Sequence, residues 1–508
     1  MPEHLRGFVV VFALSLIAFL VLRRPAVALG MGDADFRRRR NIWLAATTFA
    51  FVSSSFWIFI VAGTVLLLAA RRVERNPLPL YLFLLFVVPP FSAALPGLGV
   101  VNQLFELSFP RLLALLLLLP WAFARGRDPG RVPLGRHPID WMVLAYLLLQ
   151  LVLQLRNDTL TNTLRSGLYA GLDALLPYYV ASRAMRSTED VREAFLSFSI
   201  AVLAMVPVVA FEFGKQWLLY SALPQSLGMQ WDGGSYLGRG DALRAVAATG
   251  HPIVLGYVMA IGLFLLAGVA HGSGRARVWV MGELAIGLGL IVSLSRGPWV
   301  GAAVGILAMT AAARKPARGL VMLIVIVGLA AGALLLSPWG AKVIDYLPFV
   351  GNVDRGNVDY RQRLFDASML VISQNPLFGS PYFMYSTPME ELRSGNLIDV
   401  VNTYLLIALT DGYAGLVCFA GVFLGTAGAI VRALRRQADG DAERFLQGRA
   451  LLGALAAMLV TIATVSNILF IPILYWCLAG IAVGYVLAVP GEATLRRRHR
   501  SPLSVESP

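Results

Sequence analysis

The sequence predicts an all-α polytopic membrane protein, a bundle of about 12–14 transmembrane helices with one large extracytoplasmic loop. Hydrophobic residues make up 57% of the 508 residues and charged residues only 14%, against about 25% charged residues in soluble globular proteins. Apolar runs recur from end to end, and most approach the ~20 residues that a helix needs to cross the hydrocarbon. Runs of this length and apolarity indicate helices, because backbone groups in lipid must be hydrogen-bonded internally and barrel strands are shorter.

The arginines predict which ends of these helices face the cytoplasm. They gather in short segments between apolar runs, and the positive-inside rule places such segments in the cytoplasm. These segments are residues 71–75, 125–137, 183–192, 271–277, 314–318, 432–449 and the basic tail 490–508. The formal net charge of +14 therefore indicates membrane orientation, and we expect no nucleic-acid partner.

The predicted spans alternate in direction between these segments. The first, residues 7–22, is followed by Arg23 and Arg24 without a small-residue cleavage site, so we predict a retained helix rather than a removed signal peptide. The other predicted spans are residues 78–91, 109–124, 139–155, 167–182, 194–214, 252–270, 278–294, 298–313, 320–336, 403–430, 451–470 and 473–489. We therefore predict one integral membrane domain over residues 1–489.

Residues 41–70 conflict with this alternation. A single long span would place the arginines of residues 37–40 and 71–72 on opposite sides of the bilayer. The serine cluster at residues 53–55 interrupts the run near its middle. We therefore predict a re-entrant hairpin with both ends in the cytoplasm, packed against protein because lipid does not tolerate an exposed turn.

Two long polar segments fall on the extracytoplasmic side, residues 215–251 and residues 337–402. The second keeps aromatic and aliphatic residues among its charges, and a loop of this length inside a compact domain is usually functional or disordered. We predict a folded cap, with an amphipathic helix from Asp359 to about Ser373 and a turn over residues 374–379.

Arginines on this side are candidates for ligand binding. Arg296 lies in a turn with almost no loop, between two spans, where it is either a snorkelling anchor or a bidentate ligand of diphosphate oxygens. Arg361 and Arg363 lie on the amphipathic helix, pointing in different directions, and belong either to a solvated face or to a binding site. In the other outer loop Arg244 precedes His251, which is either a structural hydrogen-bonding group or a ligand-binding group.

Acidic residues are candidates for proton transfer. Asp399 lies three residues before Asn402, at the entrance to the predicted span 403–430. It is either a general base or the N-cap of that helix, since Asp is a preferred cap. Asp173 and Glu283 fall inside predicted spans, where an acid is a functional candidate or the partner of an arginine.

These motifs, taken in order, resemble the O-antigen ligase and the O-antigen or exopolysaccharide polymerase superfamily. The pieces that carry the resemblance are Gly250-His251-Pro252, Ser295-Arg296-Gly297 with Trp299, Arg361 through Asn375-Pro376 to Gly379, and Asn402 followed ten residues later by Gly412-x-x-Gly415. The resemblance implies a metal- and cofactor-independent glycosyltransferase of the bacterial inner membrane with a periplasmic catalytic loop. Its donor would be a glycan on undecaprenyl diphosphate. Its acceptor would be a second lipid-linked glycan in a polymerase, or a lipid A–core sugar in a ligase.

The resemblance also implies roles for individual residues. Arg296 and Arg361 would bind the donor diphosphate, and neutralising that leaving group stabilises the transition state. We add Arg244, His251 and Arg363 as substrate-binding candidates, and we take Asp399, Asn402 and Arg361 as the catalytic set.

The sequence departs from the family pattern at one position. The family commonly has a histidine immediately before the asparagine, but this chain has Val401, which cannot accept a proton. We therefore expect Asp399 to be the base, with Glu390 or Glu391 next. Because the ligases of the family rely on that histidine, the departure favours a polymerase over a ligase.

Two other classes of function remain as alternatives. A transporter or flippase of lipid-linked glycans would need charged residues along a path through both leaflets, and the predicted spans offer chiefly Asp173 and Glu283. A structural partner of other polysaccharide-assembly proteins is the third hypothesis.

Overall fold

The computed structural model describes residues 1–97, 103–124, 132–231, 233–240, 242–269, 276–337, 355–393, 398–437 and 441–488. These residues form a helix bundle, which confirms the predicted all-α polytopic class. The first helices are α1 (Glu3–Ala28), α2 (Asp33–Val52), α3 (Phe56–Arg71), α4 (Pro77–Leu84), α5 (Phe109–Leu113), α6 (Leu119–Ala124), α7 (Pro138–Gln154), α8 (Leu160–Ala170), α9 (Leu176–Ala184), α10 (Thr188–Lys215) and α11 (Leu223–Ser226). The later helices are α12 (Pro252–Ala267), α13 (Ala276–Val292), α14 (Arg296–Ala311), α15 (Pro316–Leu335), α17 (Arg355–Gln374), α18 (Thr387–Glu390), α19 (Thr403–Arg436), α20 (Ala442–Ile462) and α21 (Ile471–Leu487).

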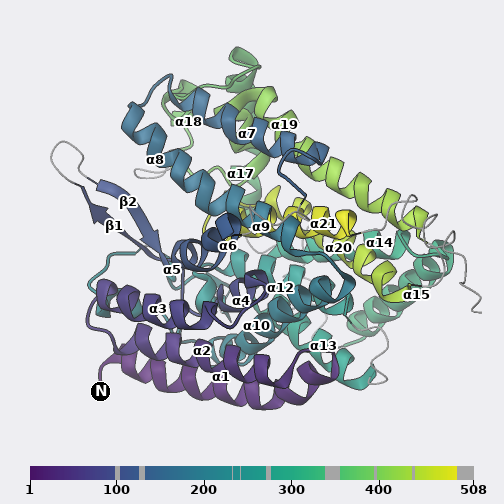
Figure 1. The fold of residues 1–508 in the computed structure, drawn as a ribbon. Helices are drawn as coiled ribbons and strands as arrows, with labels where there is room; N and C mark the ends of the chain where they lie inside the picture. Colours follow the sequence, from purple (N-terminus) through teal and green to yellow (C-terminus); the bar gives the residue numbers. More distant parts are fainter. Residues whose placement is uncertain are drawn as a thin grey trace, which may run out of the picture.

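Short irregular elements join these helices. Two antiparallel hairpins pair β1 (Ser92–Pro96) with β2 (Gln103–Ser108) and β3 (Gly238–Arg239) with β4 (Ala242–Leu243). Single π-helical turns, η1 (Ala114–Leu118) and η3 (Gly171–Leu175), interrupt two of the predicted spans, and 3₁₀ turns form η4 (Ala247–Thr249) and η5 (Phe383–Tyr385). Figure 1 shows α1, α2 and α3 along one side of the bundle and α7, α8, α17 and α18 along the opposite side.

The apolar helices fall into two length classes. Among the described residues, five helices are long and apolar enough to cross a membrane, namely α1, α10, α15, α19 and α20. Shorter apolar helices are α3, α7, α12, α13, α21 and the run 109–124. The predicted span 78–91 is different, because α4 ends at Leu84 and irregular backbone continues to Pro89 and Pro90. This irregular stretch is almost entirely buried in protein, which is the condition under which a membrane tolerates it.

The predicted break in residues 41–70 is present. α2 ends at Val52, and the hydroxyl oxygen of Ser55 caps α3 by accepting a hydrogen bond from the Ile58 amide at 3.4 Å. The far ends of the two helices meet, because the Arg38 guanidinium lies 2.6 Å from the Glu74 carboxylate. The chain therefore enters and leaves this hairpin at the same end, as predicted.

Segments that the arginine pattern assigns to the cytoplasm lie together in space. Arg39, which is 1% exposed, binds both Glu74 and Glu193, and Arg192 binds Glu443 at the start of α20. These contacts join the beginnings of α2, α10 and α20 to the end of α3. The tail 490–508 and the predicted cytoplasmic residues 125–131 and 271–275 lie outside the described residues.

Glycines bring α14 and α20 into close contact along their length. A methyl group added at Gly301 would lie 2.5 Å from the Ala457 carbonyl oxygen, and one added at Gly305 would lie 2.6 Å from that of Gly453. Gly297 precedes them with the same spacing of four residues. Small residues at this spacing let helix backbones approach closely in a membrane, so this stripe fixes the position of α14 and of Arg296 at its beginning.

Candidate functional site

Four arginines gather at the end of the bundle opposite to the Arg39 network. We call Arg239, Arg244, Arg296 and Arg361 the outer arginine cluster. Arg239 donates a hydrogen bond to the Leu294 carbonyl at 2.5 Å, and Arg244 donates to the Ser295 hydroxyl at 2.9 Å. Both side chains are therefore hydrogen-bonded to the tight turn that precedes α14. In this turn Leu294 has a positive φ of 47°.

Arg361 approaches the beginning of α14 from α17, through Thr464. Its guanidinium donates to the carbonyl oxygens of Val401 at 3.4 Å and Thr464 at 3.0 Å. Thr464 also lies against the first turn of α14, since a methyl group added at Gly297 would come 1.9 Å from its hydroxyl oxygen. The structure thus brings Arg361 to the helix that begins with Arg296, although 65 residues separate them in sequence.

The charge of Arg361 is held in an unusual environment. Its side chain is half-buried and, among the described residues, forms no ion pair. Burial lowers its pKa from the ordinary arginine value, nearby Asp399 opposes that shift, and Arg239 adds to it. The two neutral carbonyl partners orient the guanidinium without neutralising it, so it can still attract an anion.

The predicted ambiguity at the entrance to α19 is resolved. The side-chain oxygen of Asn402 accepts hydrogen bonds from the amides of Tyr404 at 2.9 Å and Leu405 at 3.2 Å. Asn402 is therefore the N-cap, and the alternative that Asp399 caps this helix is wrong. The exposed Asp399 carboxylate instead accepts a hydrogen bond from the Ser466 hydroxyl at 2.7 Å.

The segment that carries Asp399 is attached to α17. The Tyr360 hydroxyl donates to the Asp399 carbonyl oxygen at 3.0 Å, and the neighbouring Arg361 donates to the Val401 carbonyl. Two adjacent residues of one helix therefore fix the backbone around the proposed base. This places Asp399 close to Arg361 of the outer arginine cluster.

The turn after α17 is locked onto a break in α19. Gly412 has φ 68° and ψ −167°, which interrupts the helix, and a methyl group there would lie 2.4 Å from the Leu377 carbonyl. The freed amide of Tyr413 donates to Pro376 at 2.7 Å, and the Ser380 amide donates to Leu409 at 2.8 Å. Backbone hydrogen bonds thus explain the sequence motif 375–379 together with Gly412.

His251 serves as a helix cap. Its Nδ1 accepts a hydrogen bond from the Ile253 amide at 3.2 Å, at the N-terminus of α12. Burial, with a smaller contribution from the charge of Arg244, lowers the pKa of His251 to about 4. The ring is therefore neutral near pH 7 and does not add a cation to the outer arginine cluster.

Glu212 is a functional candidate that the sequence analysis missed. This residue is fully buried near the end of α10, and its carboxylate accepts hydrogen bonds from the amides of Leu219, Val246 and Ala247 at 3.0, 2.9 and 2.7 Å. It therefore fixes the backbone between Arg244 and His251. The available signal was an acid inside a predicted span, which is a functional candidate by default.

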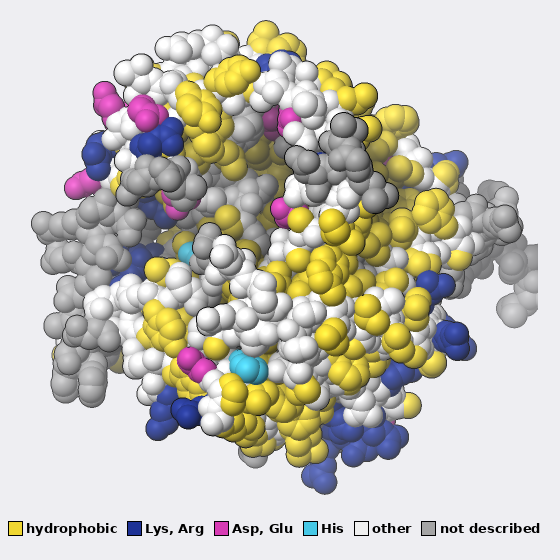
Figure 2. Space-filling model, turned by 90° about the vertical axis from the view of Figure 1, so that its left-hand side faces the viewer, with side chains coloured by type: hydrophobic (Ala, Val, Ile, Leu, Met, Phe, Trp, Pro, Cys, Tyr) yellow, Lys and Arg dark blue, Asp and Glu magenta, His cyan; other side chains and the backbone are white. Residues whose placement is uncertain are grey.

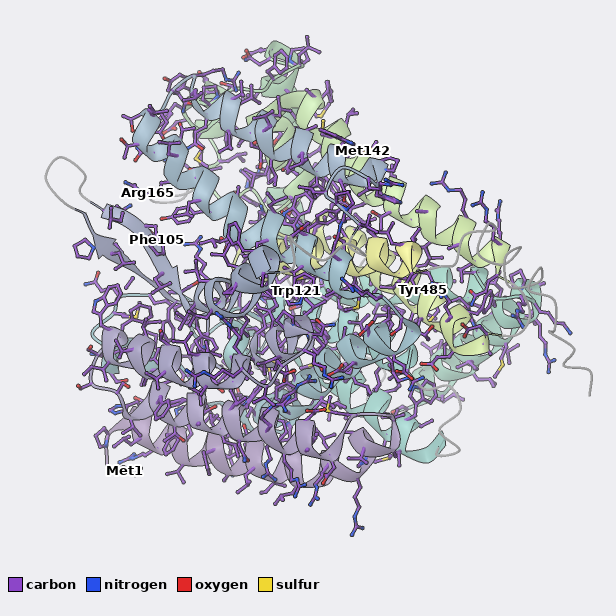
Figure 3. All side chains as sticks on the ribbon, viewed as in Figure 1. Met1, Phe105, Trp121, Met142, Arg165 and Tyr485 are labelled. Carbon is purple, nitrogen blue, oxygen red and sulfur yellow. The ribbon has the colours of Figure 1, made fainter. Side chains whose placement is uncertain are left out.

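Other predicted charges have structural partners or lie apart. Arg156 donates to the Phe378 carbonyl at 2.9 Å, and Arg165 of α8 donates to the Gln103 carbonyl at 2.7 Å, beside the strand that carries Phe105 in Figure 3. Asp173 pairs with Arg111 at 2.8 Å. The exposed side chain of Arg363 forms no hydrogen bond or ion pair with the described residues, and its charge acts on nearby Tyr360.

Three further acids differ in their surroundings. Glu390 pairs with Arg393 at 2.8 Å, and Glu391 is exposed. Glu283 keeps one buried carboxylate oxygen without a hydrogen-bond partner among the described residues.

The predicted outer face is hollowed. Figure 2 views the molecule from the side on which α1 begins and towards which the β1–β2 hairpin points, and it shows a recess between the upper and lower parts of this face. Hydrophobic side chains lie inside the recess. This face can therefore receive a ligand that is partly apolar.

The fold and the cluster define a class of protein, a multi-pass helical membrane protein with a basic site at one end of the bundle. Comparison with known families specifies it further. Residues 281–420 match the family model described as O-Antigen ligase, a region that contains Arg296, Arg361, Asp399 and Asn402. The match confirms the predicted place of this region in the O-antigen ligase and polymerase superfamily. No curated protein matches the chain.

The family match supports a coarse function. Ligases and polymerases of this kind are glycosyltransferase-like enzymes of surface-polysaccharide assembly, and they work in a membrane on lipid-linked glycans. Arg244 and His251 lie before the matched region, so their connection to the site comes from the contacts of the turn that begins α14.

Proposed function

We propose that this protein is a polymerase that joins undecaprenyl-diphosphate-linked oligosaccharide repeat units on the outer face of the bacterial inner membrane. The observation that carries the proposal is the arrangement of Arg361, half-buried, oriented by two carbonyl oxygens and close to the start of α14. A diphosphate brings oxygens that match the planar fork of a guanidinium. Arg296 and Arg361 together bind the diphosphate of the donor in this proposal, and Arg244 orients the turn that precedes Arg296.

The chemistry is a displacement at the anomeric carbon of the donor sugar. The acceptor hydroxyl oxygen forms a bond to that carbon, the bond from the carbon to the diphosphate oxygen breaks, and undecaprenyl diphosphate leaves with the electron pair. The negative charge on the leaving oxygen grows in the transition state, and prepositioned guanidinium groups stabilise it there. No metal or cofactor takes part in this proposed reaction.

Asp399 is the proposed base that receives the proton of the acceptor hydroxyl. Its carboxylate is exposed and lies near Arg361. It does not cap α19, because Asn402 is the N-cap of that helix. Glu390 is a weaker candidate because its carboxylate is already paired with Arg393. With Val401 at the position of the family histidine, a polymerase fits this arrangement better than a ligase.

The test of the diphosphate site is substitution of Arg361 and of Arg296. Either residue changed to Ala should abolish glycan assembly while the protein stays in the membrane. Arg361→Lys should restore little activity, because an ammonium group cannot form the bidentate fork. Gln362→Ala is the matched control, since Gln362 is exposed on the same helix and should leave assembly unchanged. Near-normal polymer from an Arg361→Ala strain would refute the proposed site.

Deletion of the gene separates the polymerase from the alternatives. Loss of long polymer with accumulation of single repeat units on the outer face supports the polymerase. Polymer that is made but not joined to lipid A–core would indicate the ligase instead. Accumulation of lipid-linked repeats on the cytoplasmic face would indicate a flippase.

A further inference from the structure

A groove, separate from the recess on the predicted outer face, lies at the opposite end of the bundle from the outer arginine cluster. It has a volume of about 600 Å³ and is bounded by α14, α19 and α20, which lie in the right-hand half of Figure 1. Its wall is mostly aliphatic and runs from Leu459 towards Arg314 and Arg435. The proposed glycan chemistry uses none of these residues.

Small side chains create this groove. α14 and α20 touch through Gly301 and Gly305, so no space remains between those two helices. α19 passes beside them, and at this level the facing residues include Ala312, Ala427 and Ala456. Alanines in place of larger residues leave room between α19 and the α14–α20 pair.

The groove ends in positive charge. Arg314 follows α14 and lies over the Phe445 ring, 4.7 Å from its centroid, and Arg435 is exposed in the last turn of α19. Arg435 forms no ion pair with any residue that the structure describes. The two acids at the start of α20 are engaged elsewhere, because Asp441 caps that helix and Glu443 binds Arg192.

We propose that this groove binds one anionic phospholipid of the leaflet on the predicted cytoplasmic side. An acyl chain lies along the aliphatic wall, and the headgroup phosphate lies between Arg314 and Arg435. The charge at the mouth selects an anionic headgroup over a zwitterionic one, as basic pockets between helices do on this side of membranes. A small water-soluble anion would leave most of the groove of about 600 Å³ empty and its apolar wall exposed. A lipid, which has an acyl chain as well as a phosphate, would cover this wall.

The test compares two lipids on the purified full-length protein in detergent. Phosphatidylglycerol and phosphatidylcholine with identical acyl chains are added separately, and the bound lipid is measured by native mass spectrometry. We expect preferential retention of phosphatidylglycerol, with a loss of roughly fivefold in preference for each arginine removed, from the attraction typical of one basic residue near a lipid surface. The double variant R314Q/R435Q should show almost no preference.

A matched double variant controls for net charge. R318Q/R432Q removes two exposed arginines that also lie on the predicted cytoplasmic side but do not line the groove, and it should keep the preference. Ala456→Trp fills the apolar wall with the arginines intact and should reduce binding of both lipids. Equal binding of the two lipids to the unmodified protein, or an unchanged preference in R314Q/R435Q, would overturn the proposal. A loss of preference in R318Q/R432Q equal to that in R314Q/R435Q would also overturn it.

Discussion

Substitution of Gly412 by Ala should detach the turn after α17 from α19. The backbone at φ 68° and ψ −167° lies in a region that is essentially restricted to glycine, and occupying it with another residue costs about 1–3 kcal/mol. The new methyl group would also lie 2.4 Å from the Leu377 carbonyl, so the turn must move. The hydrogen bonds from Tyr413 to Pro376 and from Ser380 to Leu409 would then be lost at about 0.5–1.5 kcal/mol each.

These contributions together predict a destabilisation of about 2–6 kcal/mol for Gly412→Ala. The measurements are the thermal unfolding midpoint of the purified protein and proteolysis of the region around α17. Gly428→Ala is the matched control, because Gly428 lies in the same helix with open space around an added methyl group and Ala favours a helix by about 0.5–1 kcal/mol. Equal midpoints for the two variants would refute the argument that backbone docking at Gly412 holds α17.

Three further substitutions test single residues of the site. Asp399→Asn should abolish glycan assembly with normal membrane insertion, and retained assembly would remove Asp399 as the base. Because the pKa of His251 is lowered to about 4 in the folded protein, folding stability should fall by up to about 3 kcal/mol as the pH drops from about 6.5 to 4. His251→Asn keeps the cap and should show a smaller pH-dependent loss by thermal unfolding. Glu212→Gln should lower the unfolding midpoint by the equivalent of about 1–3 kcal/mol and reduce glycan assembly, whereas an unchanged midpoint would contradict its role in fixing the outer loop.

Local patterns predicted those features that depend on neighbouring residues in the chain. The apolar runs predicted most of the helices, and the serine cluster at 53–55 predicted the break between α2 and α3. The beginning of α17 was also near its predicted place, at Arg355 rather than Asp359. In each case the relevant physics, burial in lipid or capping of a helix, acts within a few turns of the chain.

Features that depend on distant residues were harder to predict. The choice of cap between Asp399 and Asn402 depends on which residue has extended backbone, and both residue types suit the position. The carboxylate of Glu212 is satisfied by amides 7 to 35 residues away, and no local pattern reports such partners. The contact between the turn after α17 and the break in α19 at Gly412 is made by backbone hydrogen bonds. Backbone atoms are the same in every residue, so the only sign of this contact in the sequence is the presence of glycines.

Because α2 and α3 form a hairpin, the orientation of the rest of the chain in the membrane does not depend on how deeply this hairpin enters the bilayer. The pairing of Arg38 with Glu74 returns the chain to the end from which it departed, so the segment adds an even number of crossings, whether the helices traverse the bilayer or turn back within it. Every later helix keeps its direction in both cases. A reporter enzyme fused after residue 75 would therefore give the same inside or outside signal if the hairpin were shortened, provided that its two ends still met.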